Sequence, residues 1–334
     1  MKLIENKKFF LIAEIGNNHE GSIKNAIKLV KQAKISGADA VKFQTFIIND
    51  YIHINQKERY SRLKKFQLTF NQFLHLKKLS HKLGLKFIST PLDLKSAKFI
   101  SQISDAVKIA SGDNDNFDLI KEAAKKCKSL IISTGFADIR LTKKIYNFIK
   151  SIKGKDFVKN NFSLLHCTSS YPAKLNDTNL SAIKIMQKKF DCEIGLSDHT
   201  TGIESCFYAA FMGVRIFEKH FTLSNTFSSF IDHKVSLNPK NFKNLRKKLN
   251  DAQIVLGDGI KKLQECEEKF LLNSKRSLVA KCNLKKGTKL NKKYFKVIRP
   301  GYPDSIDINF NFKNISLREN LVKNQHLSIF HIKD

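Results

Sequence analysis

Short apolar runs alternate with amphipathic stretches over most of the chain, and this alternation predicts its architecture. The apolar runs that we expect to form strands are residues 9–16, 38–45, 86–91, 106–111, 129–135, 162–168, 193–199 and 214–221. Between and after them, apolar residues recur at helical spacing in residues 23–36, 70–83, 118–126, 143–152, 182–190, 204–212 and 241–256. Strands that alternate with helices predict a parallel sheet, and eight such units in about 250 residues favour an α/β fold, a (β/α)8 TIM barrel.

An open, doubly wound parallel sheet is the alternative to a closed barrel. When such a sheet binds a dinucleotide, a Gly-x-Gly-x-x-Gly sequence follows its first strand. No such sequence follows residues 9–16. The closed barrel is therefore the favoured fold.

The pattern changes after the last helical stretch, and this change predicts a second domain. Residues 257–274 are polar and charged, and we expect them to form a linker. Residues 275–334 contain short apolar runs and turns with little helical period. A unit of about 60 residues builds only a small core by itself. We therefore expect a catalytic barrel at residues 1–256, a linker at 257–274 and a small, mostly β domain at 275–334.

The composition excludes a disordered chain, and the net charge suggests nucleic acid as one class of partner. The chain of 334 residues is 42% hydrophobic, which is too apolar for an unfolded chain. It has 60 Lys and Arg against 30 Asp and Glu, a net charge of +30, which would suit a nucleic-acid partner. However, the lysines are spread along the whole chain without a basic arm or an Arg-Gly-rich tract. We therefore expect a solvated basic surface that helps to attract an anionic substrate, and no nucleic-acid partner.

The apolar runs and the cysteines predict a cytoplasmic protein that does not enter a membrane. No apolar run approaches about 18 residues, so we expect no transmembrane helix. The first run is short and contains Glu14, which argues against a secretory signal. The six cysteines lie far apart without a Cys-x-x-Cys pair, so neither a zinc ribbon nor a redox motif is expected. Most of them should be reduced core thiols.

Polar side chains end all eight expected strands, and this is where the active site of a barrel lies. Residues two positions apart on a strand face the same side. Three polar pairs have this spacing: Lys42 with Gln44, Ser197 with His199, and Glu218 with His220. An apolar barrel interior would not contain Lys, Glu and His side chains without a ligand to satisfy them.

These side chains indicate the kind of chemistry. Lys42 and Lys108, together with Ser and Thr hydroxyls, suit a phosphate or a carboxylate. Two histidines on adjacent strand ends, His199 and His220, could hold a divalent metal with open positions that polarises a carbonyl. A carboxylate among them, Glu14 or Glu218, could position a water molecule or move a proton.

Eight short motifs, taken in chain order, resemble those of the sialic acid synthase family, which includes legionaminic and pseudaminic acid synthases. They are AEIGNNHEGS (13–22), AVKFQT (40–45), STP (89–91), VKIASG (107–112), ISTG (132–135), LHCT (165–168) with Tyr171-Pro172, GLSDHT (195–200) and EKHF (218–221). The C-terminal unit is similar to the family's antifreeze-like (SAF) domain at Arg276-Ser277, Lys285-Lys286-Gly287 and Arg299-Pro300-Gly301. The resemblance thus extends over nearly the whole chain.

The resemblance implies an enzyme that condenses phosphoenolpyruvate and water with the open-chain aldehyde of an N-acetylated mannose-type sugar. The sugar would be N-acetylmannosamine or its 2,4-diacetamido-trideoxy analogue, and the products a nine-carbon 2-keto acid and phosphate. His199 and His220 would hold the metal, which is typically manganese. Catalysis would rest on Glu14, Lys42, Lys108 and Glu218, with phosphoenolpyruvate contacting the two lysines and Thr90, Ser111, Ser133 and Ser197. The sugar would contact Gln44, Asp113, Ser169, Tyr171, Asp232 and Arg299, the last from the other subunit of a domain-swapped homodimer.

Three departures from the family pattern bear on the sugar. Ser169 stands where N-acetylneuraminate synthases often have Asn, which is closer to the legionaminic and pseudaminic branches. The opening EIGNNH is less like the pseudaminic branch. Asp113 replaces the usual Glu, and residues 224–231 lack the usual Pro-Gly-Pro before Asp232. The sugar therefore stays open.

Two other functions compete with the synthase. A strand-end lysine in a barrel, Lys42 or Lys108, could form an imine with a carbonyl substrate, as in a Schiff-base aldolase. Borohydride trapping would support that aldolase, whereas loss of activity on metal chelation would support the synthase. The net charge alone suggests a non-enzymatic nucleic-acid-binding protein, which salt-dependent DNA retention without turnover would favour.

Overall fold

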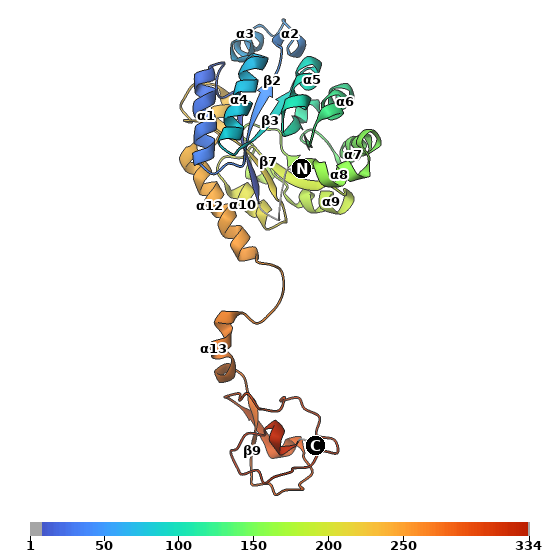
Figure 1. Ribbon diagram of the computed structural model, residues 1–334, viewed down its shortest axis with the longest axis vertical. Helices are drawn as coiled ribbons and strands as arrows, with labels where there is room; N and C mark the ends of the chain where they lie inside the picture. Colours follow the sequence, from blue (N-terminus) through green and yellow to red (C-terminus); the bar gives the residue numbers. More distant parts are fainter. Residues whose placement is uncertain (1–8, 333–334) are drawn as a thin grey trace. The chain divides into compact units, whose positions relative to one another are not determined.

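The computed structural model describes residues 9–332, which divide after Gly257 into two compact units. In the first unit, eight parallel strands close into a barrel in chain order, and β1 pairs with both β2 and β8 (Figure 1). The strands are β1 (Phe10–Gly16), β2 (Ala40–Thr45), β3 (Lys86–Pro91), β4 (Ala106–Ile109), β5 (Leu130–Ser133), β6 (Phe162–Cys167), β7 (Glu193–Asp198) and β8 (Ile216–His220). The predicted TIM barrel is confirmed.

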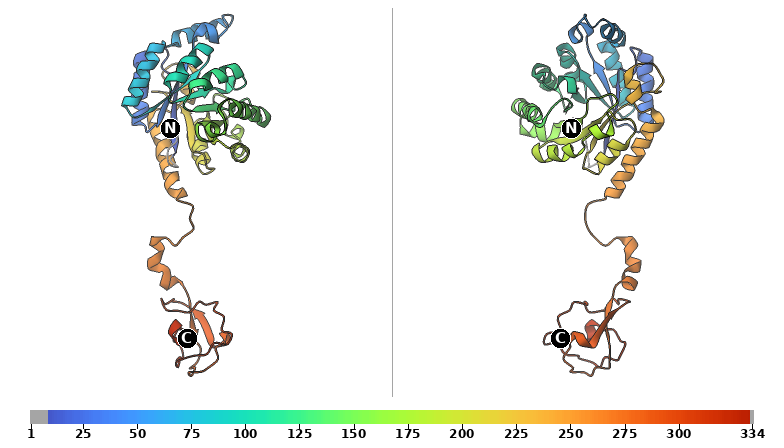
Figure 2. Two further views of the ribbon diagram at one scale, coloured as in Figure 1. Left: turned by 45° about the vertical axis from the view of Figure 1, so that its right-hand side comes forward. Right: turned by 180° about the vertical axis from the view of Figure 1, so that it is seen from behind.

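Helices connect the strands and form the outer layer of the barrel (Figure 2). They are α1 (Ile23–Ile35), α2 (Ile48–Tyr51), α3 (Lys57–Phe66), α4 (Phe70–Lys82), α5 (Leu94–Ile103), α6 (Phe117–Lys126), α7 (Ile139–Lys153), α8 (Lys155–Asn161), α9 (Ser181–Lys189), α10 (Glu204–Ala210), α11 (Ile231–Val235) and α12 (Pro239–Leu256). Several begin at a side chain that accepts a hydrogen bond from the first turn, among them Ser22, Asp93 and Asp138. The largest apolar cluster joins the outward side chains of the strands to the inner faces of these helices.

Three helices at the carboxyl end of the barrel, α2, α3 and α11, go beyond the predicted alternation. The connection after β2 contains α2 and α3 before α4 begins. Its apolar side chains form a cluster of their own with the loop before α11: Phe46, Ile48, Ile52, Leu63, Phe66 and Leu92, with Phe230 against them. The helical period in α2 is too short to recognise in the sequence, since α2 has a single turn.

The second unit contains a helix, α13 (Glu265–Ser274), and an antiparallel pair of strands, β9 (Ser277–Ala280) and β10 (Phe295–Ile298). The segment expected as a linker thus includes a helix, whose residues are all partly or fully exposed. The core of this unit is a small apolar cluster around Leu278, Phe295 and Leu321. No helix within residues 9–332 combines the length and the apolar character needed to cross a lipid bilayer.

Candidate active site

The interior of the barrel has two layers, and the alternation of side chains along each strand produces them. The lower layer is apolar and consists of Phe10, Ile12, Ala40, Ile88, Ala106, Ile131, Leu165 and Ile216. On β7 this layer holds Gly195, where a Cβ atom would lie 2.5 Å from Leu165 Cδ2 and 2.7 Å from Ile216 O. Two residues further along the strands, the inward side chains are polar: Glu14, Lys42, Thr90, Lys108, Ser133, Cys167, Ser197 and Glu218. The strand period therefore places an apolar floor beneath a polar layer.

Four charged side chains of the polar layer form one buried cluster. Lys42 Nζ lies 2.9 Å from Glu14 Oε2 and 3.5 Å from Glu218 Oε2. Lys108 Nζ donates to Glu218 Oε1 at 2.9 Å and to Oε2 at 3.2 Å. None of the four is more than 4% exposed. The cluster contains two ammonium groups and two carboxyl groups, so each lysine has an acidic partner that an anionic substrate could replace.

Two hydroxyl groups complete the contacts of this cluster. Lys42 Nζ donates to Thr90 Oγ1 at 3.3 Å, and Ser197 Oγ donates to Glu218 Oε1 at 2.8 Å. The structure therefore brings together six of the residues that the sequence predicted for catalysis and phosphoenolpyruvate binding. They come from β1, β2, β3, β4, β7 and β8, so only the closed barrel makes them neighbours.

The two carboxyl groups of the cluster differ in acidity. Burial and the nearby Glu218 charge raise the pKa of Glu14 to about 7, with Lys42 opposing. Burial alone would raise the pKa of Glu218, but Lys108 and Lys42 hold it well below its usual value. Glu218 is therefore a permanent counter-ion, whereas Glu14 can exchange a proton near neutral pH. Two carboxyls with such different environments are a common arrangement for separating acid–base and electrostatic roles.

The two lysines also differ. Burial tends to lower the pKa of Lys42, but Glu14 and Glu218 outweigh it and raise the pKa above its usual value. Burial lowers the pKa of Lys108, and the charge of Lys42 adds to this effect while Glu218 opposes it. Lys42 is thus the more firmly charged of the two.

Above the charged cluster, His199 and His220 lie beside each other with ring centroids 5.3 Å apart. The ring of Tyr171 lies 4.3 Å from His199 and 5.7 Å from His220. Asp232 Oδ2 is 3.9 Å from His220 Nδ1, and burial raises the pKa of this carboxyl to about 6. The predicted metal ligands and two of the predicted sugar contacts therefore meet at one place on the rim.

The hydrogen bond of His199 and the low pKa of His220 fit a divalent metal. His199 Nδ1 lies 2.9 Å from Thr168 O, and because a carbonyl only accepts, Nδ1 carries the proton and Nε2 keeps a lone pair. His220 Nδ1 is buried without a hydrogen-bond partner among residues 9–332. Burial and the charges of His199 and Lys42 keep the pKa of His220 well below its usual value, and a neutral ring is the form that binds metal. Within the described residues no cluster of three acidic, His or Cys groups has metal-site geometry, so two imidazoles would be the protein ligands.

A third group of site residues surrounds the end of β6. Cys167 Sγ lies 3.5 Å from Ser111 Oγ, 3.8 Å from Ser169 Oγ and 3.6 Å from His199 Nδ1. Ser111 Oγ also accepts from the backbone N–H of Gly135 at 3.1 Å. A Cβ atom at Gly135 would stand 2.1 Å from Ser169 Oγ, so only glycine allows this close approach.

Cys167 is a site residue that the sequence analysis missed, since most cysteines were expected in the core. Its thiol is buried, but it belongs to the polar layer and not to the apolar core. Burial would raise the pKa of Cys167, yet the contacts with His199, Ser111 and Lys108 lower it to about 7. Its position two residues beyond Leu165 on the inward face was the available signal.

The remaining predicted residues lie around this centre with fewer contacts. Ser133 Oγ is buried without a hydrogen-bond partner within residues 9–332, while the Ser133 carbonyl accepts from Asn114 Nδ2 at 3.2 Å. Gln44 Oε1 accepts from Asn17 Nδ2 at 2.7 Å. Asp113 lies in the turn after β4, where burial and Asp115 raise its pKa to about 6. No hydrogen bond or ion pair joins Asp113 to the charged cluster among the residues that the structure describes.

Arg299 belongs to the second unit, where its Nε donates to Ser274 O at 2.8 Å. The role of Arg299 in the site is therefore a matter for the proposal below.

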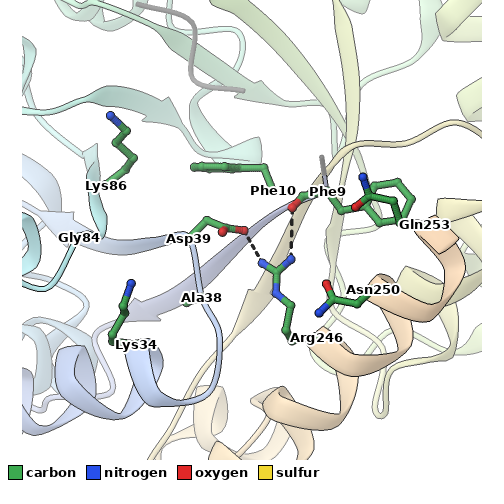
Figure 3. Close-up of a pocket in the computed structure, with 10 residues that line it drawn as sticks. All are labelled: Phe9, Phe10, Lys34, Ala38, Asp39, Gly84, Lys86, Arg246, Asn250 and Gln253. Atoms are coloured by element: carbon green, nitrogen blue, oxygen red, sulfur yellow. Dashed lines mark hydrogen bonds and ion pairs between the residues drawn. The ribbon is translucent and has the colours of Figure 1, made fainter. Parts of the chain in front are cut away.

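A separate pocket of about 420 Å³ lies at the opposite end of the strands, around their amino termini (Figure 3). Arg246 of α12 lines this pocket. Its Nη1 donates to Phe9 O at 3.2 Å, its Nε donates to Gly37 O at 2.7 Å, and its Nη2 forms an ion pair with Asp39. These bonds fasten α12 to the beginnings of β1 and β2. The pocket contains none of the predicted site residues, and its arginine is fully engaged in holding the barrel together.

The sequence and the structure were compared with known proteins. A family model described as the NeuB family matches residues 29–261. The chain is 39% identical over 296 residues to the uncharacterized protein MJ1065 of Methanocaldococcus jannaschii, covering 87% of this chain and 85% of that protein. It is 38% identical over 295 residues to an N,N'-diacetyllegionaminic acid synthase of Campylobacter jejuni, covering 84% and 87%.

A solved structure agrees with these matches. The N-acetylneuraminic acid synthetase of Leptospira borgpetersenii, in complex with citrate, superposes with a TM-score of 0.73 at 33% identity, over 78% of this chain and 90% of that one. The chain belongs to the NeuB family. It is an enzyme of the phosphoenolpyruvate-dependent synthases that make sialic, legionaminic and pseudaminic acids, and the predicted family is confirmed. The comparisons leave the sugar that this NeuB enzyme uses open.

Proposed function

We propose that this NeuB enzyme condenses phosphoenolpyruvate with an N-acetylated mannose-type sugar and water, to give a nine-carbon 2-keto acid and phosphate. The observation that carries the proposal is the buried layer of two lysines and two carboxyls beneath a pair of histidines. A substrate that has both a phosphate and a carboxylate group can pair with Lys42 and Lys108 in place of Glu14 and Glu218. An aldehyde can lie above it, at the rim.

The lysines bind and orient phosphoenolpyruvate in this proposal. Lys42 and Lys108 offset its negative charge and hold its C3 toward the aldehyde carbon. Ser111, Ser133 and Ser197 add hydroxyl donors, and Ser133 Oγ has no partner among residues 9–332. Attack by C3 on the aldehyde carbon forms the new C–C bond and leaves an oxocarbenium-like C2. The aldehyde C=O bond opens in the same step, and its oxygen takes up a proton from solvent to become a hydroxyl.

Glu14 moves the proton in this proposal. Its pKa of about 7 leaves a large ionised fraction at neutral pH, so it can accept a proton from the water that adds to C2. In the resulting hemiketal phosphate, the hydroxyl on C2 loses its proton and the bond between C2 and the phosphate ester oxygen breaks. This releases phosphate and leaves the ketone. A divalent metal on His199 and His220, which we propose to be manganese, supplies Lewis-acid polarisation of the sugar's carbonyl.

Phosphate release is the direct test of this function. Purified protein is incubated with phosphoenolpyruvate, Mn²⁺ and a panel of N-acetylated sugars, and phosphate is measured together with the mass of the organic product. We expect phosphate and a nine-carbon keto acid in equal amounts with at least one sugar. Phosphate release that does not depend on any sugar would contradict the proposal.

The sugar that we propose is the 2,4-diacetamido-trideoxy form. The Campylobacter jejuni relative is a synthase of a diacetylated acid, and Ser169 stands at the rim where N-acetylneuraminate synthases often have Asn. Ser offers one short hydroxyl, whereas Asn offers an amide that both donates and accepts. Gly135 closes one side of Ser169, so a longer side chain here must turn toward the site.

Ser169→Asn should therefore move the preference toward N-acetylmannosamine. One buried polar group gained or lost changes discrimination by about ten- to a hundredfold. The measurement is the ratio of kcat/KM for the two sugars in wild type and variant. A wild type that prefers N-acetylmannosamine, with a ratio that the substitution does not change, would show that Ser169 does not contact the sugar.

We also propose that residues 275–334 form an SAF-like domain that acts in the partner's active site, in a domain-swapped homodimer. Two observations support this: the motifs around Arg276, Lys285 and Arg299, and a small core that is confined to the second unit. In this assembly, Arg299 of the partner subunit would contact the sugar.

Subunit mixing tests the swap. Arg299→Ala and His220→Ala subunits should each be inactive alone, whereas a dimer with one of each regains one complete site. We expect activity to return in heterodimers isolated through two different tags, up to about half of the wild-type rate per dimer. Inactive heterodimers of confirmed composition would mean that Arg299 acts in its own chain or has no role in the reaction.

A Schiff-base aldolase remains the second candidate because the pKa of Lys108 is lowered, as an imine-forming amine requires. Its ion pair with Glu218 at 2.9 Å favours the charged form instead. Borohydride in the presence of sugar and pyruvate separates the two functions. A covalent adduct on Lys108 would favour the aldolase.

A further inference from the structure

A pocket of about 440 Å³ lies beside the rim, between α3 and the loop that precedes α11. The lining of this pocket includes Glu20, Arg62, Phe66, Ser228, Phe230 and Ile231. The loop is part of residues 224–231, the segment that departs from the family pattern. This departure therefore shapes a pocket next to the active site.

The loop is held in place by contacts to both sides of the pocket. Ser228 Oγ donates to Glu20 Oε1, and His233 Nε2 lies 3.2 Å from the same oxygen. The ring of Phe230 packs edge-on against Phe66, with centroids 5.2 Å apart. His233 is fully buried and bonds Thr222 Oγ1 at 2.7 Å through its other nitrogen. The pocket thus has a defined wall.

The polar groups of the pocket keep free hydrogen-bonding capacity. Arg62 makes no hydrogen bond or ion pair within residues 9–332, and its guanidinium lies 5.9 Å from the centre of the Phe230 ring. Glu20 uses Oε1 for Ser228 and His233, while Oε2 has no hydrogen bond with any described residue. The pocket therefore offers a donor group, an acceptor oxygen and an aromatic face.

The pocket adjoins the proposed sugar site. Ile231 lines the pocket, and the next residue, Asp232, lies 3.9 Å from His220. Burial raises the pKa of Asp232, and the positive charge of Arg62 is among the groups that oppose this rise, so the two side chains are electrostatic neighbours. A sugar whose aldehyde faces the two histidines can thus extend a substituent toward Arg62.

We propose that this pocket binds the second acylamino group of a diacylated amino sugar, the one further from the aldehyde; the proposal rests on the proposed function. An amide has one N–H and one carbonyl. Glu20 Oε2 accepts from the N–H, and Arg62 donates to the carbonyl. The methyl group packs on Phe66, Phe230 and Ile231, which have no polar atoms in their side chains. A charged substituent fits less well because Glu20 and Asp232 offset the charge of Arg62.

Arg62→Ala tests the proposal, with Lys64→Ala as the matched control on the same helix. Lys64 is exposed, carries the same charge and does not line the pocket. We expect Arg62→Ala to lower kcat/KM about tenfold for 2,4-diacetamido-2,4,6-trideoxymannose and less than about twofold for N-acetylmannosamine. Lys64→Ala should change neither value. An equal loss for both sugars, or no loss for either, would overturn the proposal.

A second variant and a binding measurement distinguish a failure of the pocket proposal from a failure of the proposed synthase function. Ser229→Phe fills the pocket from an exposed position of the loop and should also reject only the diacetamido sugar. Calorimetric titration of both sugars into the full chain, with inorganic phosphate present as the anion that the lysines bind, requires no turnover. Tighter binding of the diacetamido sugar that Arg62→Ala removes would support the pocket even if no phosphate were released. Equal binding of both sugars by the wild type would contradict the pocket while leaving the synthase function standing.

Discussion

Replacing His220 or His199 with alanine is expected to lower kcat/KM by about a thousandfold or more, because a metal ion supplies several kcal/mol of carbonyl polarisation. The rings lie 5.3 Å apart at the ends of β7 and β8, and burial holds His220 in the neutral, metal-binding form. Removing His220 breaks no hydrogen bond at its Nδ1, since this atom has no hydrogen-bond partner among residues 9–332. The barrel should therefore stay folded while metal affinity falls.

Mn²⁺ titration followed by electron paramagnetic resonance, together with a thermal melt, checks this result independently of activity. His166→Ala is the matched control, since His166 lies on β6 and bonds Thr178 O at 2.7 Å through Nε2. It should keep its metal affinity. If the His220 and His199 variants bound Mn²⁺ as wild type does, or if wild type stayed active after exhaustive chelation, the metal role of this pair would be wrong.

Glu218→Gln is expected to destabilise the protein by about 3–5 kcal/mol, since removal of one partner leaves buried charges without compensation. Glu218 is the only one of the two carboxyls that contacts both lysines, at 3.5 Å from Lys42 and 2.9 Å from Lys108. Without it, Lys108 has no carboxylate partner within residues 9–332. An anion that binds between the lysines restores the missing charge, so phosphate should raise the melting temperature more in the variant than in wild type.

Asp198→Asn is the control for this rescue. Asp198 and Lys219 form another buried ion pair, at 2.6 Å, but their side chains point away from the barrel interior. This variant should also be destabilised, yet inorganic phosphate should raise its melting temperature no more than it raises that of wild type. Equal phosphate stabilisation of wild type, Glu218→Gln and Asp198→Asn would show that the anion does not replace the charge of Glu218.

The sequence was sufficient for the barrel and its polar layer because both follow from local rules. Each strand carries a buried apolar run, and its last inward residues are polar. Once Glu14 and Lys42 lie on the neighbouring strands β1 and β2 of a closed sheet, their contact follows from the period of two. The predicted residues of β1, β2, β3, β4, β7 and β8 therefore meet without any further information.

The parts that the sequence did not predict depend on contacts between distant loops. The inward position of Cys167 on β6 did not by itself show that its thiol contacts His199 and Ser111. The pocket at Arg62 depends on α3 meeting the loop at Phe230, which lies far along the chain. Asp113 and Arg299 carry family motifs, but a motif does not fix the position of a side chain in a loop or in a second unit.

The apolar floor of the barrel has a consequence for the order of events. Ile12, Ile88, Ile131, Leu165 and Ile216 fill the interior beneath the lysines, so this end of the barrel offers no passage. Both reactants must use the single opening at the carboxyl ends of the strands. A molecule that reaches Lys42 and Lys108 lies deeper than one that faces the two histidines. The deeper reactant, the anion, must therefore enter first, and its phosphate must leave last. We therefore expect a compulsory-order kinetic scheme, in which the sugar binds only to the enzyme already loaded with the anion.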